Sequence, residues 1–252
     1  MIETANERLS YMRFVFETFT SSGGRPYNED SVQAQAGEND LLAIVADGLG
    51  SHGGGDIASA LAVQELSAYW RQRRTVTKDA LLESFAQANE AVLAAQTPGR
   101  KMRTTAVLLL CHEDQAAVAH IGDSRCYYFS GGRVSFQTTD HSVSQLAVDR
   151  GEITAAQIRF HEDRNRLLRA LGNELPPGKR GAEVTFLRPL RAGDAFLLCS
   201  DGFWEYVNES EMEIDLRKSK DPREWLSLML ARLGTRVSGT NDNLSAVGVF
   251  TT

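Results

Sequence analysis

The sequence predicts an α+β fold, in which antiparallel β-sheets and α-helices are partly segregated along the chain. Most strand-like segments are short and follow one another directly, and Gly131-Gly132 between two of them is a hairpin signal. Two long helical segments follow each other after the second strand, and another lies near the C-terminus. Strands and helices do not alternate regularly, which argues against a parallel βαβ sheet.

Nine segments carry the aromatic, β-branched and apolar residues that are typical of strands. The segment 41–46 is a continuous apolar run that leads directly into Asp47-Gly48. The nine segments are residues 13–20, 41–46, 104–111, 116–121, 124–129, 133–138, 183–187, 195–199 and 244–250.

The helical segments are fewer and longer. Residues 56–73 and 77–95 carry apolar side chains at roughly helical spacing. A third helix is expected to begin at Ser142, which would form a capping box with Gln145. A fourth is expected to begin at the N-cap residue Asp221, because a proline and a glutamate follow in the first turn.

Composition and charge restrict the class of protein. The chain has 252 residues, of which 42% are apolar and 24% charged, an ordinary globular composition. No linker, low-complexity run or internal repeat divides it, so we expect one domain over residues 1–252. The formal charge is −6, from 27 basic and 33 acidic side chains, which argues against non-specific nucleic-acid binding.

The cysteines and the N-terminus indicate a cytoplasmic protein. Cys111, Cys126 and Cys199 are odd in number, widely spaced and placed in apolar segments, so we expect buried, reduced thiols. The first residues lack the apolar stretch of a signal peptide. The longest apolar run, 41–46, is too short to cross a membrane, so no membrane contact is expected.

Carboxylates recur at the ends of apolar segments. Each one alone fits a turn, because Asp and Asn favour turns and Asp-Gly is a common hairpin pair. Between apolar neighbours, several like charges are unfavourable unless a cation compensates them. Oxygen ligands without a His or Cys cluster favour Mg²⁺ or Mn²⁺ over zinc. From spacing alone, turns and a hard-metal site both stay open. The carboxylates are Glu29, Asp30, Asp47, Asp123, Asp201 and Asp242.

Eight short motifs give these residues a more specific context. They are GGRPYNEDS around Glu29, VADGLGSHGGG around Asp47, TTA from Thr104, IGDSR around Asp123, TDHS around His141, LRALG from Leu168, CSDG around Asp201 and NDN around Asp242. Any one of them is weak, but the ordered set, from Arg25 to Asn243, is highly specific. It resembles the metal-dependent protein serine/threonine phosphatases of type 2C, in their compact bacterial form.

The resemblance implies a fold and a site. The fold is a four-layer αββα sandwich, two central antiparallel β-sheets flanked by helices, with the active site at one end between the sheets. Arg25 matches the cation that receives the substrate phosphate, and Asp47 matches the carboxylate that bridges two metal ions. The implied metal ligands are Glu29, Asp30, Asp47, the Gly48 carbonyl, Asp123, Asp201 and Asp242.

Within this ligand set the resemblance implies different roles. Asp201 and Asp242 match direct ligands of the two core ions, which would be Mn²⁺ or Mg²⁺. Glu29 and Asp30 match acidic residues that hold metal-bound waters. Asp123 matches a ligand of a third, weaker ion that many bacterial members share between this residue and Asp201.

The implied reaction is hydrolysis of phosphoserine or phosphothreonine on proteins. A metal-bridging hydroxide would attack the phosphorus in line, without a phosphoenzyme, and Arg25 and Asp47 would carry catalysis. The expected partners are phosphoproteins and a bacterial Ser/Thr kinase that the enzyme opposes, and we expect a monomer. The alternative is a catalytically inactive pseudophosphatase that binds phosphoproteins. Such proteins lose metal carboxylates, whereas this chain retains the whole set.

Four residues near the motifs bear on proton transfer. Leu49 stands where animal members carry a histidine proposed as the general acid, which leaves the acid unassigned. His52 lies three residues further on, in a glycine-rich turn, where a turn role is the commoner outcome. His120 lies inside an apolar run and His141 precedes a helix, so we expect both to be structural.

The remaining expectations concern packing and substrate access. Residues 142–172 match the variable flap beside the active site, and their mixed charges fit either a solvated surface or substrate docking. Trp204 and Tyr206 are expected to pack in the core, although aromatics at that spacing also fit a peptide groove. Thr104-Thr105 is expected on a strand beneath the site.

Overall fold

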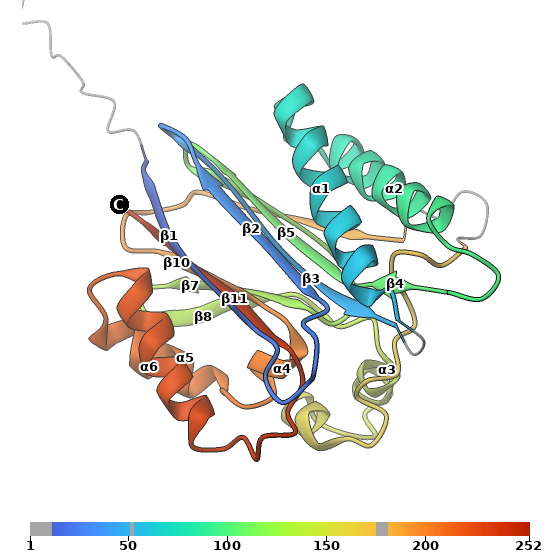
Figure 1. Cartoon of the computed structure of the whole chain (residues 1–252). Coiled ribbons are helices and arrows are strands. Elements are labelled where there is room, and N and C mark those ends of the chain that lie inside the picture. The colour runs from blue at the N-terminus through green and yellow to red at the C-terminus, as the bar shows by residue number, and fades with distance from the viewer. Residues whose placement is uncertain (1–11, 51–52, 175–180) are drawn as a thin grey trace, which may run out of the picture.

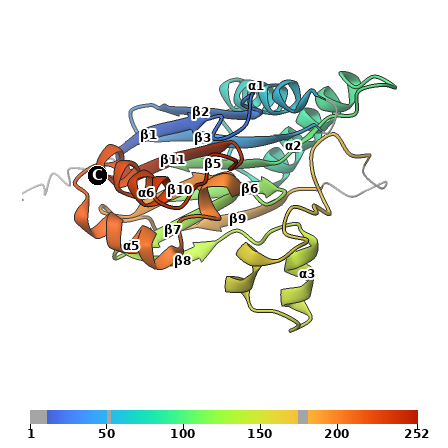
Figure 2. The ribbon, with the colours of Figure 1, turned by 60° about the horizontal axis from the view of Figure 1, so that its bottom comes forward.

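Two antiparallel β-sheets pack face to face, and helices cover the outer face of each sheet (Figure 1, Figure 2). The computed structural model describes residues 12–50, 53–174 and 181–252. All paired strands named here are antiparallel, so the predicted α+β fold and its four-layer αββα arrangement are confirmed.

Sheet A brings the two ends of the described chain together. Its strand order is β1-β11-β10-β7-β8. The first and last strands pair over their whole length, so the segment after β1 lies beside the segment before β11. This register places the Arg25 loop next to Asp242. The strands are β1 (Phe14–Ser21), β7 (Arg125–Ser130), β8 (Arg133–Gln137), β10 (Ala195–Cys199) and β11 (Leu244–Thr251).

Sheet B has the order β2-β3-β5-β6-β9, and the short strand β4 pairs with the end of β3. Its central strands β3, β5 and β6 are buried along most of their length, which explains their near-continuous apolar runs. The strands are β2 (Asp30–Ala36), β3 (Asp40–Leu49), β4 (Arg103–Thr104), β5 (Ala106–His112), β6 (Gln115–Ile121) and β9 (Glu183–Leu187).

Three apolar layers hold the sandwich together. One joins sheet B to the long helices α1 and α2, the second lies between the sheets, and the third joins sheet A to the C-terminal helices. The three cysteines are free and buried, as predicted. The helices are α1 (Gly55–Arg73), α2 (Lys78–Ala94), α3 (Val143–Asp149), the 3₁₀ helix η1 (Ala155–Phe160), α4 (Asp201–Trp204), α5 (Glu209–Lys218) and α6 (Pro222–Gly234).

The flap, residues 142–172, leaves the sandwich at one end and returns to it (Figure 2). It carries α3 and η1, and two backbone bridges fasten its base. One joins Ser142 to Leu167, and the other joins Leu171 to Thr104 of β4. Because β4 pairs with the end of β3, the flap is attached to the strand that carries Asp47.

Three sequence-based expectations need correction. β2 was not among the predicted strands, because its residues alternate between small and polar types without a β-branched run. α5 was also missed, because most of its residues are charged, although Asn208 and Glu211 form a capping box at its start. The predicted box at Ser142 is only half formed: Ser142 accepts from the Gln145 amide, but the Gln145 side chain bonds Asp149 instead.

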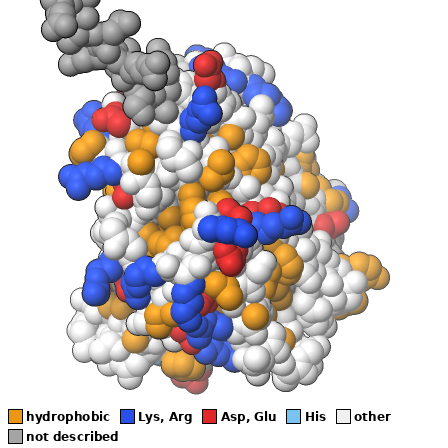
Figure 3. Space-filling model, turned by 90° about the vertical axis from the view of Figure 1, so that its left-hand side faces the viewer, with side chains coloured by type: hydrophobic (Ala, Val, Ile, Leu, Met, Phe, Trp, Pro, Cys, Tyr) orange, Lys and Arg blue, Asp and Glu red, His pale blue; other side chains and the backbone are white. Residues whose placement is uncertain are grey.

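The surface mixes both signs of charge. On the face shown in Figure 3, basic and acidic side chains lie next to one another with apolar side chains between them. Such a surface agrees with the modest net charge of −6. None of the helices in the described part of the chain is long and apolar enough to cross a membrane.

Candidate active site

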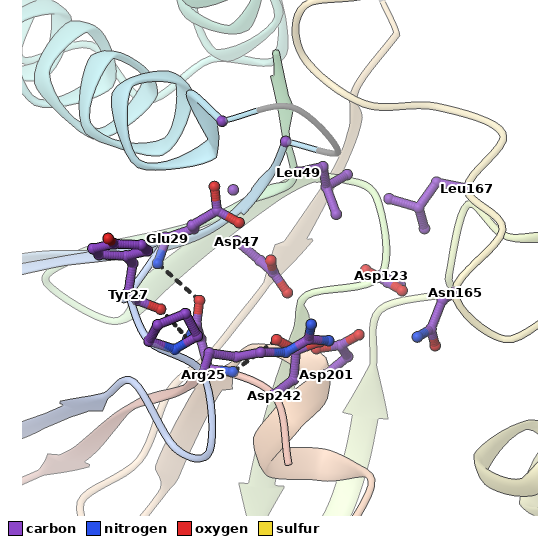
Figure 4. A pocket seen from close by; sticks show the side chains of 15 residues that line it. Arg25, Tyr27, Glu29, Asp47, Leu49, Asp123, Asn165, Leu167, Asp201 and Asp242 are labelled. Atoms are coloured by element: carbon purple, nitrogen blue, oxygen red, sulfur yellow. Dashed lines mark hydrogen bonds and ion pairs between the residues drawn. The ribbon is translucent and has the colours of Figure 1, made fainter. Parts of the chain in front are cut away.

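A pocket of about 460 Å³ opens at one end of the sandwich, where strands of both sheets end (Figure 4). Seven of the eight residues that the sequence singled out line it. The eighth, Asp30, lies just behind the wall and is 8% exposed. The lining residues that were predicted are Arg25, Glu29, Asp47, Gly48, Asp123, Asp201 and Asp242.

The sheets deliver these carboxylates from opposite sides. Asp30 and Asp47 face each other directly across the β2–β3 ladder of sheet B. Asp201 begins α4 directly after β10, and Asp242 precedes β11, so both come from sheet A. Asp123 lies in the turn that connects β6 of sheet B to β7 of sheet A. The convergence depends on strand ends that lie far apart in sequence.

Two glycines allow the close approach of backbone that this convergence needs. A Cβ on Gly48 would lie 2.1 Å from the Gly55 carbonyl oxygen, so no other residue fits without displacing the start of α1. Gly122 has φ +99°, and a Cβ there would meet the Thr105 side chain at 2.6 Å. Gly122 thereby sets the turn that aims Asp123 into the pocket.

Thr104 and Thr105 fix the backbone of Asp47. The Thr104 hydroxyl and the Thr105 amide both donate to the Asp47 carbonyl oxygen, at 2.9 Å each. The Asp47 amide donates in turn to the Thr105 hydroxyl at 3.0 Å. The two threonines therefore lie beneath the site, as the sequence predicted, and leave the Asp47 carboxylate free to face the pocket.

The carboxylates form an acidic pocket, defined here as Glu29, Asp30, Asp47, Asp123, Asp201 and Asp242. Burial raises the pKa of Asp47 and of Asp123 well above the usual range, and neighbouring carboxylates raise both further. Burial, together with the charges of Glu205 and Asp242, raises the pKa of Asp201 to about 7. Burial raises the pKa of Asp30 to about 6, against hydrogen bonds from two serines.

Little positive charge compensates this set. Among the described residues, Arg25 is the one basic side chain that lines the pocket, and its Nη2 lies 2.8 Å from Asp242 Oδ2. Within the same part of the chain, Asp30 Oδ1 and Asp201 Oδ1 are buried without any hydrogen-bond partner. Unpartnered buried carboxylate oxygens are unfavourable in the absence of a cation.

The donor set fits a hard divalent cation. All side-chain candidates are carboxylates, the oxygen ligands that Mg²⁺ and Mn²⁺ prefer. No His or Cys among the described residues lines the pocket, which argues against zinc. His120, His141 and Glu183 form a separate cluster behind the Asp123 turn. There the Arg169 guanidinium already lies within 3.3 Å of both His141 and Glu183.

The hydrogen bonds of His141 define its tautomer. The Gly122 amide donates to His141 Nδ1 at 3.2 Å, so the proton of the neutral ring is on Nε2, which faces Glu183 at 3.1 Å. The His141 amide donates back to the Gly122 carbonyl oxygen at 2.9 Å. Burial lowers the pKa of His141 to about 4, which keeps the ring neutral. His120 stacks on this ring and is also buried, so both histidines have the expected structural character.

A second group of buried charges lies next to the Asp123 turn. This Arg125 cluster consists of Arg125, Tyr127, Asp140 and Trp204. Arg125 makes two hydrogen bonds to Asp140, at 2.8 and 2.7 Å, and its guanidinium lies 3.5 Å from the Trp204 ring centroid. The Trp204 indole donates to the Asp123 carbonyl oxygen at 3.0 Å. Trp204 is therefore a core residue, as predicted, and it also supports the Asp123 turn.

The flap makes ion pairs with the segment that follows Asp201. Arg159 of η1 bonds Glu209 at 2.5 Å, and Arg164 bonds Glu205 at 2.5 Å. These flap charges thus face protein partners in addition to solvent. The flap also contributes Asn165 and Leu167 to the pocket wall, opposite Tyr27 (Figure 4).

Sequence reasoning missed two residues that shape the site. Asn243 holds the Arg25 loop, because its side chain accepts from the Glu29 amide and donates to the Ser22 and Tyr27 carbonyl oxygens. The NDN motif marked this position, but nothing in the sequence showed that its amide bonds the opposite end of the chain. Asn165 had no motif at all. His52, the nearest alternative acid, lies outside the described residues.

The comparisons with known proteins agree with this geometry. The family model described as "Protein phosphatase 2C" matches residues 22–247. The chain belongs to the protein phosphatase 2C family. It is 32% identical over 232 residues to the serine/threonine phosphatase stp of Listeria monocytogenes, covering 88% of this chain and 90% of the relative.

Two solved structures extend the likeness to the fold. The Mycobacterium tuberculosis serine/threonine phosphatase PstP/Ppp superposes with a TM-score of 0.78 at 31% identity, covering 94% of this chain and 98% of that chain. The PstP catalytic domain in complex with two manganese ions superposes with a TM-score of 0.79 at 28% identity, covering 96% and 99%. The matches support a phosphoprotein phosphatase, and they do not favour the inactive alternative.

Proposed function

We propose that this protein phosphatase 2C member hydrolyses phosphoserine and phosphothreonine on proteins with the help of divalent cations held in the acidic pocket. The observation that carries the proposal is the pocket itself: six carboxylates from both sheets converge at one end of the sandwich, and among the described residues Arg25 is the one basic side chain that lines the pocket. The relatives named above are serine/threonine phosphatases, which supports the substrate class.

The residues proposed to hold the cations are those that the resemblance implied. Asp47, Asp201 and Asp242, with the Gly48 carbonyl, are the proposed ligands of two core ions, and Glu29 and Asp30 are proposed to hold coordinated water. We assign Asp123 to a third ion. Bound there, Mn²⁺ or Mg²⁺ would activate water as the nucleophile and neutralise charge on the phosphoryl oxygens.

Arg25 is proposed to orient the phosphate. Its side chain is 55% exposed at the mouth of the pocket, and its planar guanidinium suits two phosphate oxygens at once. In the structure it bonds Asp242, so a phosphate would compete with that carboxylate for the same donor. Asn243 contributes by holding the loop that carries Arg25.

The cellular role follows from the chemistry as a proposal. We infer one catalytic domain over residues 1–252, acting as a monomer in the cytoplasm and opposing a Ser/Thr kinase. The location rests on the three buried, free thiols, which are typical of a reducing compartment. The kinase follows from the substrate class, since phosphoserine and phosphothreonine are kinase products.

Hydrolysis of a phosphothreonine peptide tests the proposal directly. The wild-type protein should release phosphate with Mn²⁺ and lose the activity in EDTA. Asp201→Asn should be inactive, while Asp114→Asn, an exposed aspartate far from the pocket, should behave as wild type and serves as the matched control. A folded, Mn²⁺-loaded protein without turnover would leave the pseudophosphatase as the better description.

A further inference from the structure

A second groove lies beside the acidic pocket. It has a volume of about 740 Å³ and shares Leu49 and Gly50 with the pocket as a common wall. It is bounded by the end of α2, by β4 and by the chain that leaves the flap, all on the right-hand side of Figure 1. Its remaining lining residues are Leu93, Gln96, Lys101, Arg103, Gly172, Asn173 and Glu174.

The groove differs from the acidic pocket in charge. Lys101 and Arg103 line it and are exposed, and Glu174 is the one carboxylate among its described lining residues. Neither cation has an ion pair or side-chain hydrogen bond with any described residue. By contrast, Arg159 and Arg164 of the flap each have a carboxylate partner. Two cations without a partner in the described part of the chain therefore lie beside the pocket where the phosphate is proposed to bind.

The segment that carries the cations is held firmly. Met102 between them is fully buried against α1 and α2, so extended backbone turns Lys101 and Arg103 outward. The Gln96 side chain donates to the Met102 and Gly172 carbonyl oxygens at 2.8 Å each. Thr104 exchanges two backbone hydrogen bonds with Leu171. Lys101 and Arg103 thus extend from a hydrogen-bonded backbone segment, which holds them at a fixed position relative to the acidic pocket.

We propose that this basic groove, Lys101 and Arg103, binds an anionic side chain of the substrate protein that flanks the phosphoserine or phosphothreonine being hydrolysed. The inference rests on the proposed function and adds a specificity to it. The occupant is the substrate's own chain, because the groove adjoins the pocket and shares Leu49 and Gly50 with it. Two cations on a protein of net charge −6 are too few for nucleic acid.

The two flanks of the pocket would then select different residues. On the groove side, a glutamate, an aspartate or a second phosphate meets Lys101 and Arg103. Elsewhere the pocket wall is formed by Pro26 and by Tyr27, a residue that is 77% exposed. The enzyme should therefore prefer acidic residues on one side of the phosphorylated residue and not on the other.

The test uses phosphothreonine peptides that carry two glutamates within four residues before the site, two after it, or none. Wild type should show a higher kcat/KM for one acidic peptide than for the neutral one. Lys101→Gln/Arg103→Gln should lower kcat/KM for that peptide by about 5- to 10-fold, the size expected for two exposed ion pairs. The neutral peptide and p-nitrophenyl phosphate should change less than about 2-fold.

Two further variants sharpen the result. Glu174→Gln should increase the preference for the acidic peptide, because Glu174 is the one carboxylate among the described residues that line the groove. Arg71→Gln/Arg73→Gln, which removes two exposed cations at the far end of α1, is the matched control and should leave the preference unchanged. Replacing the two glutamates by one phosphothreonine separates a second phosphate from carboxylates, and the stronger response is expected for the phosphate.

Each outcome has one meaning. Equal kcat/KM for all three peptides, or an equal loss on every substrate in Lys101→Gln/Arg103→Gln, would overturn the groove and leave the phosphatase assignment intact. Failure to hydrolyse any substrate in Mn²⁺ would overturn the proposed function, and the groove with it. A preference that disappears at 0.5 M salt in wild type would support the groove, since exposed ion pairs are screened.

Discussion

The acidic pocket and the Arg125 cluster are both buried and both charged, yet they are balanced differently. In the Arg125 cluster every charge has a partner: the guanidinium has two bonds to Asp140, a third to the Tyr127 hydroxyl at 3.1 Å, and a tryptophan face beneath it. In the pocket, buried carboxylates face one another, and two of their oxygens have no partner among the described residues. The Asp123 turn contacts both regions, since Asp123 lines the pocket and its carbonyl oxygen accepts from Trp204 of the cluster.

The difference indicates which region serves the fold and which serves the chemistry. A buried ion pair with its hydrogen bonds satisfied is compatible with a stable core, although it contributes little net stability. A cluster of unpaired carboxylates destabilises the metal-free protein, so its retention points to a bound cation. A neutral side chain in the acidic pocket should therefore abolish activity and leave the free energy of unfolding unchanged or higher. A neutral side chain in the Arg125 cluster should lower the free energy of unfolding and affect activity less.

The largest effect is expected for Asp201→Asn. The amide removes a proposed metal ligand, so kcat/KM for a phosphothreonine peptide should fall by more than about 100-fold. Because the change also removes a buried like charge, the free energy of unfolding in EDTA should stay the same or rise. Urea titration of both proteins measures the second effect, and a clear loss of stability would mean that Asp201 supports the fold.

Asp140→Asn should show the reverse. It leaves the Arg125 guanidinium buried with a poorer partner, which destabilises proteins by about 3–5 kcal/mol. Urea titration in EDTA should detect this loss, while Mn²⁺-dependent activity at low temperature should fall far less than in Asp201→Asn. If the two variants lost activity equally at a temperature where both are folded, the two regions would not be separable.

The pH dependence of stability sharpens the contrast further. Folding raises the pKa of Asp201 from about 3.9 in an unfolded chain to about 7, so the folded state binds the proton more tightly. Stability therefore falls as pH rises through the folded pKa, by up to about 1.4 kcal/mol per pH unit for each proton. His141, with its lowered pKa, has the opposite slope, because its unfolded form loses its proton around pH 6.5; the ring is mostly neutral in both states above about pH 7.5.

Unfolding in EDTA at pH values from about 7.5 to 8.5 isolates the carboxylates from the histidines, which are then mostly neutral in both states. We expect the free energy of unfolding to decrease over this window in the wild type, because Asp47 and Asp123 titrate in the same direction. Saturating Mn²⁺ should flatten the curve, since a bound cation stabilises the ionised form. A wild-type curve that stays flat in EDTA would contradict the uncompensated charge.

The sequence predicted the parts of the fold that depend on local pattern. The continuous apolar run of β3 predicted both the strand and the place of Asp47 at its end. Sheet edges were harder: β2, with its alternating small and polar residues, has no strong strand signal and pairs because β3 offers it a partner. α5 is held by a capping box and by Met212 and Leu216 in the core, a signal too short for periodicity alone.

The candidate site likewise has a part that the sequence predicted and a part that it did not. The motifs identified the residues that line the pocket, but their roles as metal ligands stay predictions, as does the extent of the single domain. The contacts that position these residues join distant segments, such as Asn243 to Tyr27 or Trp204 to Asp123. No spacing rule in one sequence predicts such bonds, because they depend on how the two sheets stack.

The smallest expected effect concerns the turn that presents Asp123 to the acidic pocket. His141 accepts from the Gly122 amide through Nδ1 and thereby holds the turn that presents Asp123. His141→Asn keeps an acceptor near the Nδ1 position, whereas His141→Gln keeps a polar group near Nε2 and loses that acceptor. We therefore expect His141→Gln to raise the Mn²⁺ concentration for half-maximal binding to the weakest site by about 10-fold, and His141→Asn to raise it much less.

Mn²⁺ binding followed by electron paramagnetic resonance measures this without relying on turnover. His120→Gln is the matched control, because His120 is equally buried and stacks on His141 but bonds the Thr139 carbonyl oxygen, not the Gly122 turn. It should lower stability without changing Mn²⁺ affinity. Equal shifts in His141→Gln and His120→Gln would reduce the role of His141 to packing. Unchanged Mn²⁺ binding in Asp123→Asn would instead remove Asp123 from the proposed ligands.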